Sequence, residues 1–242
     1  MIQNRRYIII GLIVIAVLIA GWAVWASVYF SPSISLQNSP SSGNGIAQVI
    51  STSTSPLETP GPLGDAVLGA DDAPVTMVEY ASLTCPHCGE FHMRTLPLIK
   101  EKYIDTGKVR LVFREYPFDP LATAGFIVAL CAGEERYFGF IDLLFSQQNE
   151  WMNSVQPMAS LESLARQGGF NAEEFRACLK DETLLSHVRD VQGRGQRELE
   201  VRSTPTFFIN GEKVQGNRPY KELEAIIEQH LPEDMRDTSD GD

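Results

Sequence analysis

The sequence predicts an α/β domain in which one β-sheet carries helices on both faces, with an all-helical subdomain inserted in the middle of the chain and one transmembrane helix before it. Two observations predict this fold: a long uncharged apolar run opens the chain, and strand-like segments flank about eighty helical residues. Apolar residues make up 43% of the 242 positions, enough for a sizeable core. The net charge of −11 argues against nucleic-acid binding, which needs Lys and Arg to displace phosphate counterions.

Residues 1–30 are expected to form an N-terminal membrane anchor. Arg5 and Arg6 precede an apolar run in which Ile8 to Ala26 supplies 19 residues without a charge. At ~1.5 Å per residue this run spans roughly 28 Å, close to the bilayer's hydrocarbon core, and the arginines predict a cytoplasmic N-terminus. A cleaved signal sequence ending near Val24-Trp25-Ala26 is the main alternative, and a buried core helix is another. Either membrane interpretation places the rest of the chain in an oxidising compartment.

The segment after the anchor predicts a flexible stalk. Residues 31–63 are rich in Ser, Thr, Pro, Gly and Asn and contain one charged side chain, Glu58. Such a composition cannot bury enough apolar surface to offset chain entropy. The folded domain is therefore expected at 64–232, followed by an acidic tail at 233–242.

The first half of the domain predicts a strand, a helix and a second strand. Val75 to Tyr80 is short, apolar and β-branched apart from Glu79, which indicates a buried strand. Cys85-Pro86 opens a helical stretch to about Tyr103, because proline suits a first helical turn; Pro97 should kink it. Val109 to Tyr116 is the second strand.

The remainder predicts helices at about 118–200 and then a hairpin and a closing helix. The expected helices of this insertion are 121–132, 134–148, 160–167, 171–179 and 183–199. One of them should begin with a capping box formed by Asn171 and Glu174. Thr206–Ile209 and Glu212–Val214 flank the turn signal Asn210-Gly211, and Pro219–His230 closes the domain. Strands paired across an insertion make one sheet with helices on both faces, a thioredoxin-like arrangement.

Cys85 and Cys88 have the spacing of a redox pair. Cys85 would sit at a helix N-terminus, where orphan N–H groups and the helix dipole favour a thiolate, the nucleophilic form of cysteine. Cys88 lies one turn later, near enough to form a Cys85–Cys88 disulfide. His87 can donate a hydrogen bond or a positive charge to the thiolate, which would make the disulfide more oxidising. Half of a zinc site and a purely structural disulfide are the alternatives, but no second pair of closely spaced ligands follows, so no metal or cofactor is predicted.

The Cys85-Pro86-His87-Cys88 motif and its context resemble the DsbA-type thiol:disulfide oxidoreductases of the bacterial periplasm, over roughly Gly64 to Leu231. The resemblance implies that Thr204-Pro205 forms a cis-proline loop beside the disulfide. It also implies that Glu79 is a proton acceptor or electrostatic modulator near Cys88; a strand-end glutamate that reaches solvent or an arginine is the alternative. Threonine before this proline departs from the best-known oxidases, which carry valine, and is shared with isomerase-like relatives.

Cys131 and Cys178 fall in two separate helices of the insertion, 47 positions apart. Free thiols beside an oxidase site would be hazardous in an oxidising compartment, so we expect a structural Cys131–Cys178 disulfide. The alternative is a pair of unpaired buried cysteines that act as small apolar residues.

The predicted activity is oxidation of thiols in exported proteins to disulfides by a single-pass protein of the cytoplasmic membrane, whose domain faces the periplasm or another extracytoplasmic space. The expected partners are reduced exported proteins and a quinone-linked or similar membrane protein that reoxidises the dithiol; a monomer is expected. A disulfide isomerase or reductase on the same fold is the first alternative. A non-catalytic binding or chaperone-like surface protein is the second.

Overall fold

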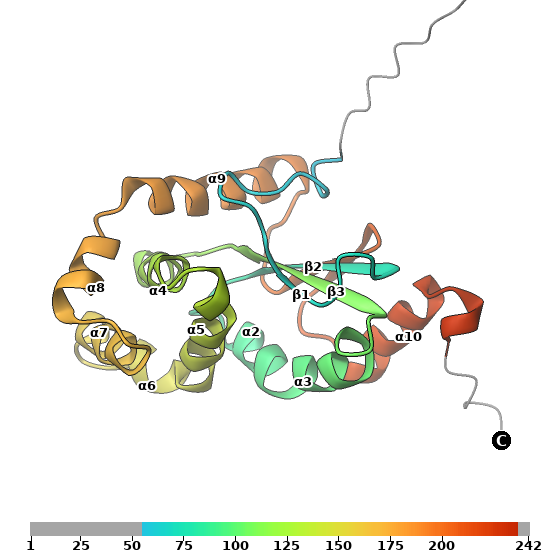
Figure 1. Cartoon of the computed structure of the whole chain (residues 1–242), viewed down its shortest axis with the longest axis horizontal. Helices are drawn as coiled ribbons and strands as arrows, with labels where there is room; N and C mark the ends of the chain where they lie inside the picture. Colours follow the sequence, from blue (N-terminus) through green and yellow to red (C-terminus); the bar gives the residue numbers. More distant parts are fainter. Residues whose placement is uncertain (1–54, 237–242) are drawn as a thin grey trace, which may run out of the picture. The chain divides into compact units, whose positions relative to one another are not determined.

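The computed structural model describes residues 55–236, in which a mixed sheet is covered by helices on both faces (Figure 1). The strand order in this sheet is β1-β3-β2-β4-β5. Only β2 and β3 run parallel to each other; the other neighbouring strands are antiparallel. The strands are β1 (Ala66–Leu68), β2 (Val75–Ala81), β3 (Val109–Glu115), β4 (Thr206–Ile209) and β5 (Glu212–Gln215).

Strand β2 lies at the centre of the sheet, and its alternation of side chains sets the two faces. Met77 belongs to the apolar cluster on the face covered by the helices after Cys85, whereas Val78 and Tyr80 belong to the cluster on the opposite face. Because side chains alternate along a strand, Glu79 shares its face with Met77. It is fully buried and lies in register between Phe113 and Phe207 of the flanking strands.

The helix that follows Cys85 is continuous and contains two π-helical turns. It consists of α2 (Pro86–Glu90), the π-helical turn η1 (Phe91–Thr95), α3 (Leu96–Ile99) and a second π-helical turn η2 (Lys100–Ile104). Pro97, which was expected to kink this helix, is the second residue of α3 and lies two positions after the end of the first π turn. A π turn accommodates a nearby proline because the regular i→i−4 hydrogen bonds, to which proline cannot contribute, are already interrupted there.

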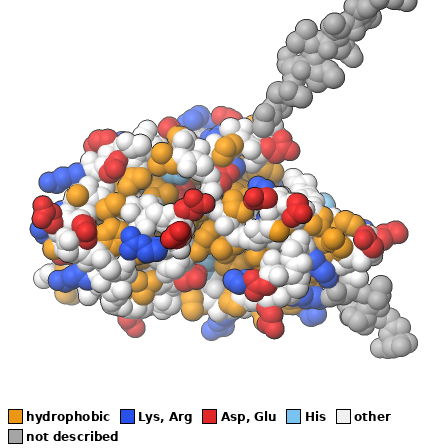
Figure 2. All heavy atoms as spheres, in the orientation of Figure 1, with side chains coloured by type: hydrophobic (Ala, Val, Ile, Leu, Met, Phe, Trp, Pro, Cys, Tyr) orange, Lys and Arg blue, Asp and Glu red, His pale blue; other side chains and the backbone are white. Residues whose placement is uncertain are grey.

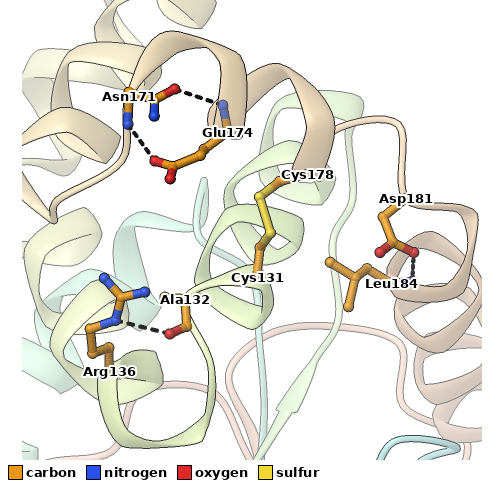
Figure 3. Close-up of a disulfide and its surroundings, with 8 residues drawn as sticks. All are labelled: Cys131, Ala132, Arg136, Asn171, Glu174, Cys178, Asp181 and Leu184. Carbon is orange, nitrogen blue, oxygen red and sulfur yellow. Dashed lines mark hydrogen bonds between the residues drawn. A yellow bond between two sulfur atoms is a disulfide. The ribbon is translucent and has the colours of Figure 1, made fainter.

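The insertion contains one more helix than the sequence predicts. Its helices are α4 (Pro120–Cys131), α5 (Glu134–Ser146), α6 (Gln148–Met152), α7 (Pro157–Gln167), α8 (Ala172–Cys178) and α9 (Glu182–Glu198). The expected helix 134–148 ends at Ser146, and α6 is a separate short helix after it. The capping box of Asn171 and Glu174 is confirmed (Figure 3).

Helices α9 and α10 (Tyr220–His230) lie on opposite faces of the sheet (Figure 1). Val191 of α9 packs with Val78 and Tyr80, while Ile227 of α10 packs with the cluster around Met77. The insertion helices α4 to α8 lie together at one end of the sheet, and a short 3₁₀ turn, η3 (Glu233–Met235), follows α10. The space-filling view shows acidic and basic side chains interspersed with apolar ones on this face (Figure 2).

The described part of the predicted stalk, residues 55–63, is attached to the domain. The buried guanidinium of Arg114 donates to the carbonyl oxygens of Leu57 and Thr59, each at 2.9 Å, and pairs with Asp65 at 2.8 Å. The N–H of Leu63 donates to Nδ1 of His187 at 3.1 Å. These contacts place residues 55–63 with the folded domain.

Within residues 55–236, none of the helices combines the length and the apolar character that a bilayer crossing requires. The predicted anchor at 1–30, the remainder of the stalk up to residue 54 and the end of the acidic tail from residue 237 lie outside the described residues.

Candidate active site

Cys85 occupies the N-cap position of α2, at the point where the chain leaves β2 and turns into a helix. Its backbone is extended, and its carbonyl accepts from the N–H groups of Cys88 and Gly89, each at 3.1 Å. Pro86 takes the first helical position, where its missing N–H removes no helical hydrogen bond. The half-buried sulfur of Cys85 therefore lies at the open N-terminal end of a helix.

The surroundings of Cys85 favour its thiolate and lower its pKa from the ordinary 9.0 to about 5. The largest cause is a hydrogen bond from the Cys88 thiol; partial burial opposes it, and Thr204 and the backbone N–H groups of Cys88 and His87 add further donors. His87 thus acts on Cys85 through its backbone N–H, and the residue itself is exposed. These donors stabilise the negatively charged sulfur, the form that attacks disulfides and departs from them.

Cys88 lies in the opposite environment. It is fully buried, and this burial is the largest cause that raises the pKa of its thiol well above the usual range. The neighbouring Cys85 and the charge of Glu79 raise the pKa further. Neither cysteine takes part in a disulfide in this structure. Cys85 is the partly exposed sulfur with the lowered pKa, and Cys88 is the buried sulfur with the raised pKa.

The loop before β4 approaches Cys85 from the other side. The peptide bond between Thr204 and Pro205 is cis, and the Cys85 thiol donates to the Thr204 carbonyl at 3.3 Å. A thiolate cannot donate, so this contact belongs to the protonated form. The buried Thr204 hydroxyl has no partner while Cys85 is protonated, which leaves it available as a donor to the thiolate.

Glu79 lies beneath α2 and is paired with a residue that the sequence did not mark as its partner. Its two carboxylate oxygens lie 3.0 and 3.2 Å from Nε2 of His92, and both side chains are buried. The alternative in which Glu79 reaches solvent does not apply, because its exposed fraction is 0%. The charge of Glu79 therefore acts on Cys88, the buried member of the cysteine pair, and helps to raise the pKa of its thiol.

The chain is similar to known proteins in sequence and in fold. A sequence model of the thioredoxin family matches residues 63–229. The crystal structure of Wolbachia pipientis alpha-DsbA1 is 31% identical, with a TM-score of 0.64 over 68% of this chain and 89% of that one. The chain belongs to the DsbA branch of the thioredoxin family.

Two further relatives of this DsbA-type chain come from bacteria. The disulfide bond formation protein D of Bacillus subtilis is 30% identical over 69% of this chain and 78% of that protein. A Rickettsia bellii protein is 33% identical over 174 residues, which are 70% of this chain and 65% of that protein. The chain thus spans slightly less than two thirds of this Rickettsia relative.

Gln148 of α6 is a site residue of this DsbA-type chain that sequence reasoning missed. Its side-chain amide donates to the carbonyl oxygens of Leu83 and Cys85 at 2.8 and 2.9 Å. The packing is close, since a Cβ added at Gly89 would lie 2.6 Å from Oε1 of Gln148. The inserted subdomain thus holds the backbone on both sides of the turn into α2. No local signal marks this glutamine, because its partners lie more than sixty positions away.

Replacing Gln148 with Glu is expected to weaken this attachment. An ionised carboxylate of the same shape cannot donate to the two carbonyls, and its charge opposes the Cys85 thiolate. We expect the free energy of unfolding to fall by about 1–3 kcal/mol and the pKa of Cys85 to rise. Urea unfolding and thiolate absorbance measure both effects. Gln147→Glu, one position earlier and only partly buried, is the control; an equal effect there would contradict the assignment.

The second pair of cysteines of this DsbA-type chain lies away from the active site. Cys131, at the end of α4, is joined to Cys178, at the end of α8, with 5.9 Å between their Cα atoms (Figure 3). The disulfide connects two helices within the insertion. Among residues 55–236, no three His, Cys, Asp or Glu side chains are grouped so that they could hold a metal ion.

Proposed function

We propose that this chain is a thiol:disulfide oxidoreductase that oxidises the thiols of exported proteins, with Cys85 and Cys88 as its redox pair. The observation that carries the proposal is the contrast between the two sulfurs. Cys85 is accessible with a pKa of about 5, whereas Cys88 is buried with a raised pKa. Stabilising a thiolate favours the reduced protein and therefore makes its disulfide a stronger oxidant.

The reaction begins with the Cys85–Cys88 disulfide. A substrate thiolate attacks the Cys85 sulfur, a mixed disulfide forms, and the electron pair of the broken bond stays on Cys88, which takes up a proton. A second substrate thiolate then attacks the substrate sulfur of the mixed disulfide and expels Cys85 as a stable thiolate. The substrate has lost two electrons and the protein has gained them. A quinone-linked or similar membrane partner would accept these electrons and restore the disulfide.

The surface beside Cys85 suits unfolded polypeptide substrates. Thr84 donates a hydrogen bond to Asp119, so the loop before α4 lies next to the active-site turn. Phe118 in this loop is 56% exposed, which is high for a large aromatic side chain. It would contact apolar side chains that an unfolded substrate still exposes.

An extracytoplasmic location at the membrane completes the proposal. The apolar run from Ile8 to Ala26 behind Arg5 and Arg6 supports an anchor in the cytoplasmic membrane, with the domain facing the periplasm or an equivalent space. The Cys131–Cys178 disulfide supports an oxidising compartment, because structural disulfides rarely persist in the cytosol.

The test uses the full chain in detergent. Reduced, unfolded ribonuclease is mixed with the oxidised protein, and the gain of ribonuclease activity is followed, while equilibration with glutathione gives the reduction potential. We expect rapid disulfide formation and a potential near the oxidising end of the thioredoxin family, about −180 to −120 mV. A potential near about −270 mV would indicate a reductase instead. Faster activation of scrambled than of reduced ribonuclease would indicate an isomerase.

A further inference from the structure

Cys88 must exchange a proton with solvent in every turnover of the proposed reaction, yet solvent does not reach it. Its exposed fraction is 0%, and Cys85, the only other thiol of the site, is a thiolate at neutral pH and so carries no proton to give. When Cys88 leaves the active-site disulfide it needs a proton, and when the disulfide reforms it must release one. A buried group of this kind requires a path of titratable side chains or water.

Glu79 and His92 form such a path beneath α2. The Glu79 carboxylate is fully buried, and His92 alone hydrogen-bonds to it among residues 55–236. Nε2 of His92 faces both carboxylate oxygens, so a proton can pass between the imidazole and Glu79 without movement of either side chain.

The second ring nitrogen of His92 is unused. Nδ1 is buried and has no hydrogen-bond partner, although the ring is fixed by stacking on Phe145 at 4.3 Å and by edge contacts with Phe91 and Phe113. An unpaired buried polar group costs about 1–3 kcal/mol, so a retained one needs an explanation. Nδ1 is the ring nitrogen that does not face Glu79.

His92 also lines a groove between the helix after Cys85 and α5. The groove has a volume of about 630 Å³ and is open to solvent. Its walls are mainly apolar, and its titratable lining residues besides His92 are Asp142 and Lys100. Asp142 is an exposed residue of this lining. Partial burial of its carboxyl raises its pKa, and the interaction with His92 is the largest of those that lower it.

We propose that His92 relays protons between Glu79 and this groove, and so supplies and removes the proton of Cys88 from the side of the domain away from the substrate. When Cys88 is released, Glu79 passes a proton to the Cys88 sulfur. His92 supplies this proton to Glu79 from Nε2 and takes one at Nδ1 from a water molecule that reaches the buried ring nitrogen from the groove. One proton moves from solvent to Cys88, and reoxidation runs the path backwards.

The charged and titratable groups around this pair come from several elements. Cys88 faces it from α2, Asp142 and Tyr137 from α5, and Lys100 from η2 reaches the groove. The Tyr137 hydroxyl is engaged, since it donates to Glu115 at 2.6 Å. Asp142 is therefore the group best placed to exchange protons with His92.

The test compares full-chain variants in a single turnover, in which a dithiol peptide reduces the oxidised protein. His92→Gln keeps an amide that can donate to Glu79 but cannot relay a proton. We expect reduction and reoxidation both to slow by at least about tenfold, because a relay affects the two directions equally. The solvent deuterium isotope effect of the wild-type rate should be lost, whereas the pH dependence that the substrate thiolate contributes should remain. Asp142→Asn, at the exposed rim, should slow both directions by a smaller factor.

The matched control is His187→Gln, which alters another buried histidine beside a glutamate, 3.6 Å from Glu115 and outside the groove. The proposal is overturned if His92→Gln reacts at the wild-type rate with the wild-type isotope effect, or if His187→Gln slows the reaction equally. The relay rests on the proposed function, but the two fail separately: a wild-type protein that does not oxidise the peptide refutes the function, whatever His92 does.

Discussion

Cys85→Ser is expected to reduce disulfide formation to the uncatalysed rate, whereas Cys88→Ser should stop the reaction at the mixed disulfide. Cys85 is the accessible sulfur with the lowered pKa, so its loss removes the attacked atom. Cys88 is fully buried, so its loss leaves the first bond-forming step intact but removes the second sulfur. Mass spectrometry after mixing each reduced variant with glutathione disulfide checks both results.

Cys88→Ala is the control for the role of the Cys88 thiol as a hydrogen-bond donor. Serine can still donate to the Cys85 thiolate and alanine cannot, so the pKa of Cys85 should rise more in the alanine variant. A stable adduct on Cys88 in the Cys85→Ser protein would contradict this assignment of roles, because it would show that substrates reach the buried sulfur.

Removal of the Cys131–Cys178 disulfide by double substitution with alanine is expected to cost about 4 kcal/mol in unfolding free energy. The two cysteines are 47 positions apart, and in the chain-entropy model a cross-link over a loop of that length stabilises by about this amount. Urea unfolding of the oxidised wild type and the variant measures the difference.

The double variant also separates stability from chemistry. The disulfide joins α4 to α8, and the hydrogen-bond donors that lower the pKa of Cys85 come from neither helix. The pKa of Cys85 should therefore be unchanged while the protein unfolds at lower urea. A loss below about 1 kcal/mol would show that the disulfide does little to constrain the unfolded chain.

The parts of the fold that follow local patterns could be predicted from the sequence. The short apolar, β-branched run of β2, the proline at the first position of α2 and the capping box at Asn171 each specify an element within a few residues. Strand β1 could not be predicted, because three residues at a sheet edge are too short for a pattern and depend on pairing with β3. The π turns on either side of α3 were also missed, since a proline predicts a disturbance but not its form.

The same division holds for the active site. Cys85 and Cys88 lie three positions apart in the sequence, and this spacing predicts their chemistry. Glu79 could be singled out because a carboxylate interrupts an apolar strand, but its partner His92 lies thirteen positions away across a strand-to-helix turn. Gln148 is held in place by the tertiary packing of the insertion, which no short-range pattern encodes.

The lowered pKa of Cys85 also makes stability depend on pH in a defined direction. The thiolate exists only in the reduced protein, and its stabilisation is fully present above the ordinary pKa of 9.0 and lost as the pH falls through about 5. Lowering the pH across this window should therefore lower the unfolding free energy of the reduced form relative to that of the oxidised form. Urea unfolding of both forms over the same pH range measures this shift.

Titration of the Cys85 thiolate by its ultraviolet absorbance in the reduced full chain tests the central claim most directly. Cys85→Ser provides the baseline, and the difference between the two curves belongs to Cys85. The donors around this sulfur predict a midpoint at about 5. A midpoint near the ordinary value of 9.0 would contradict the account, because neither the helix N-terminus nor Cys88 would then stabilise the attacking sulfur.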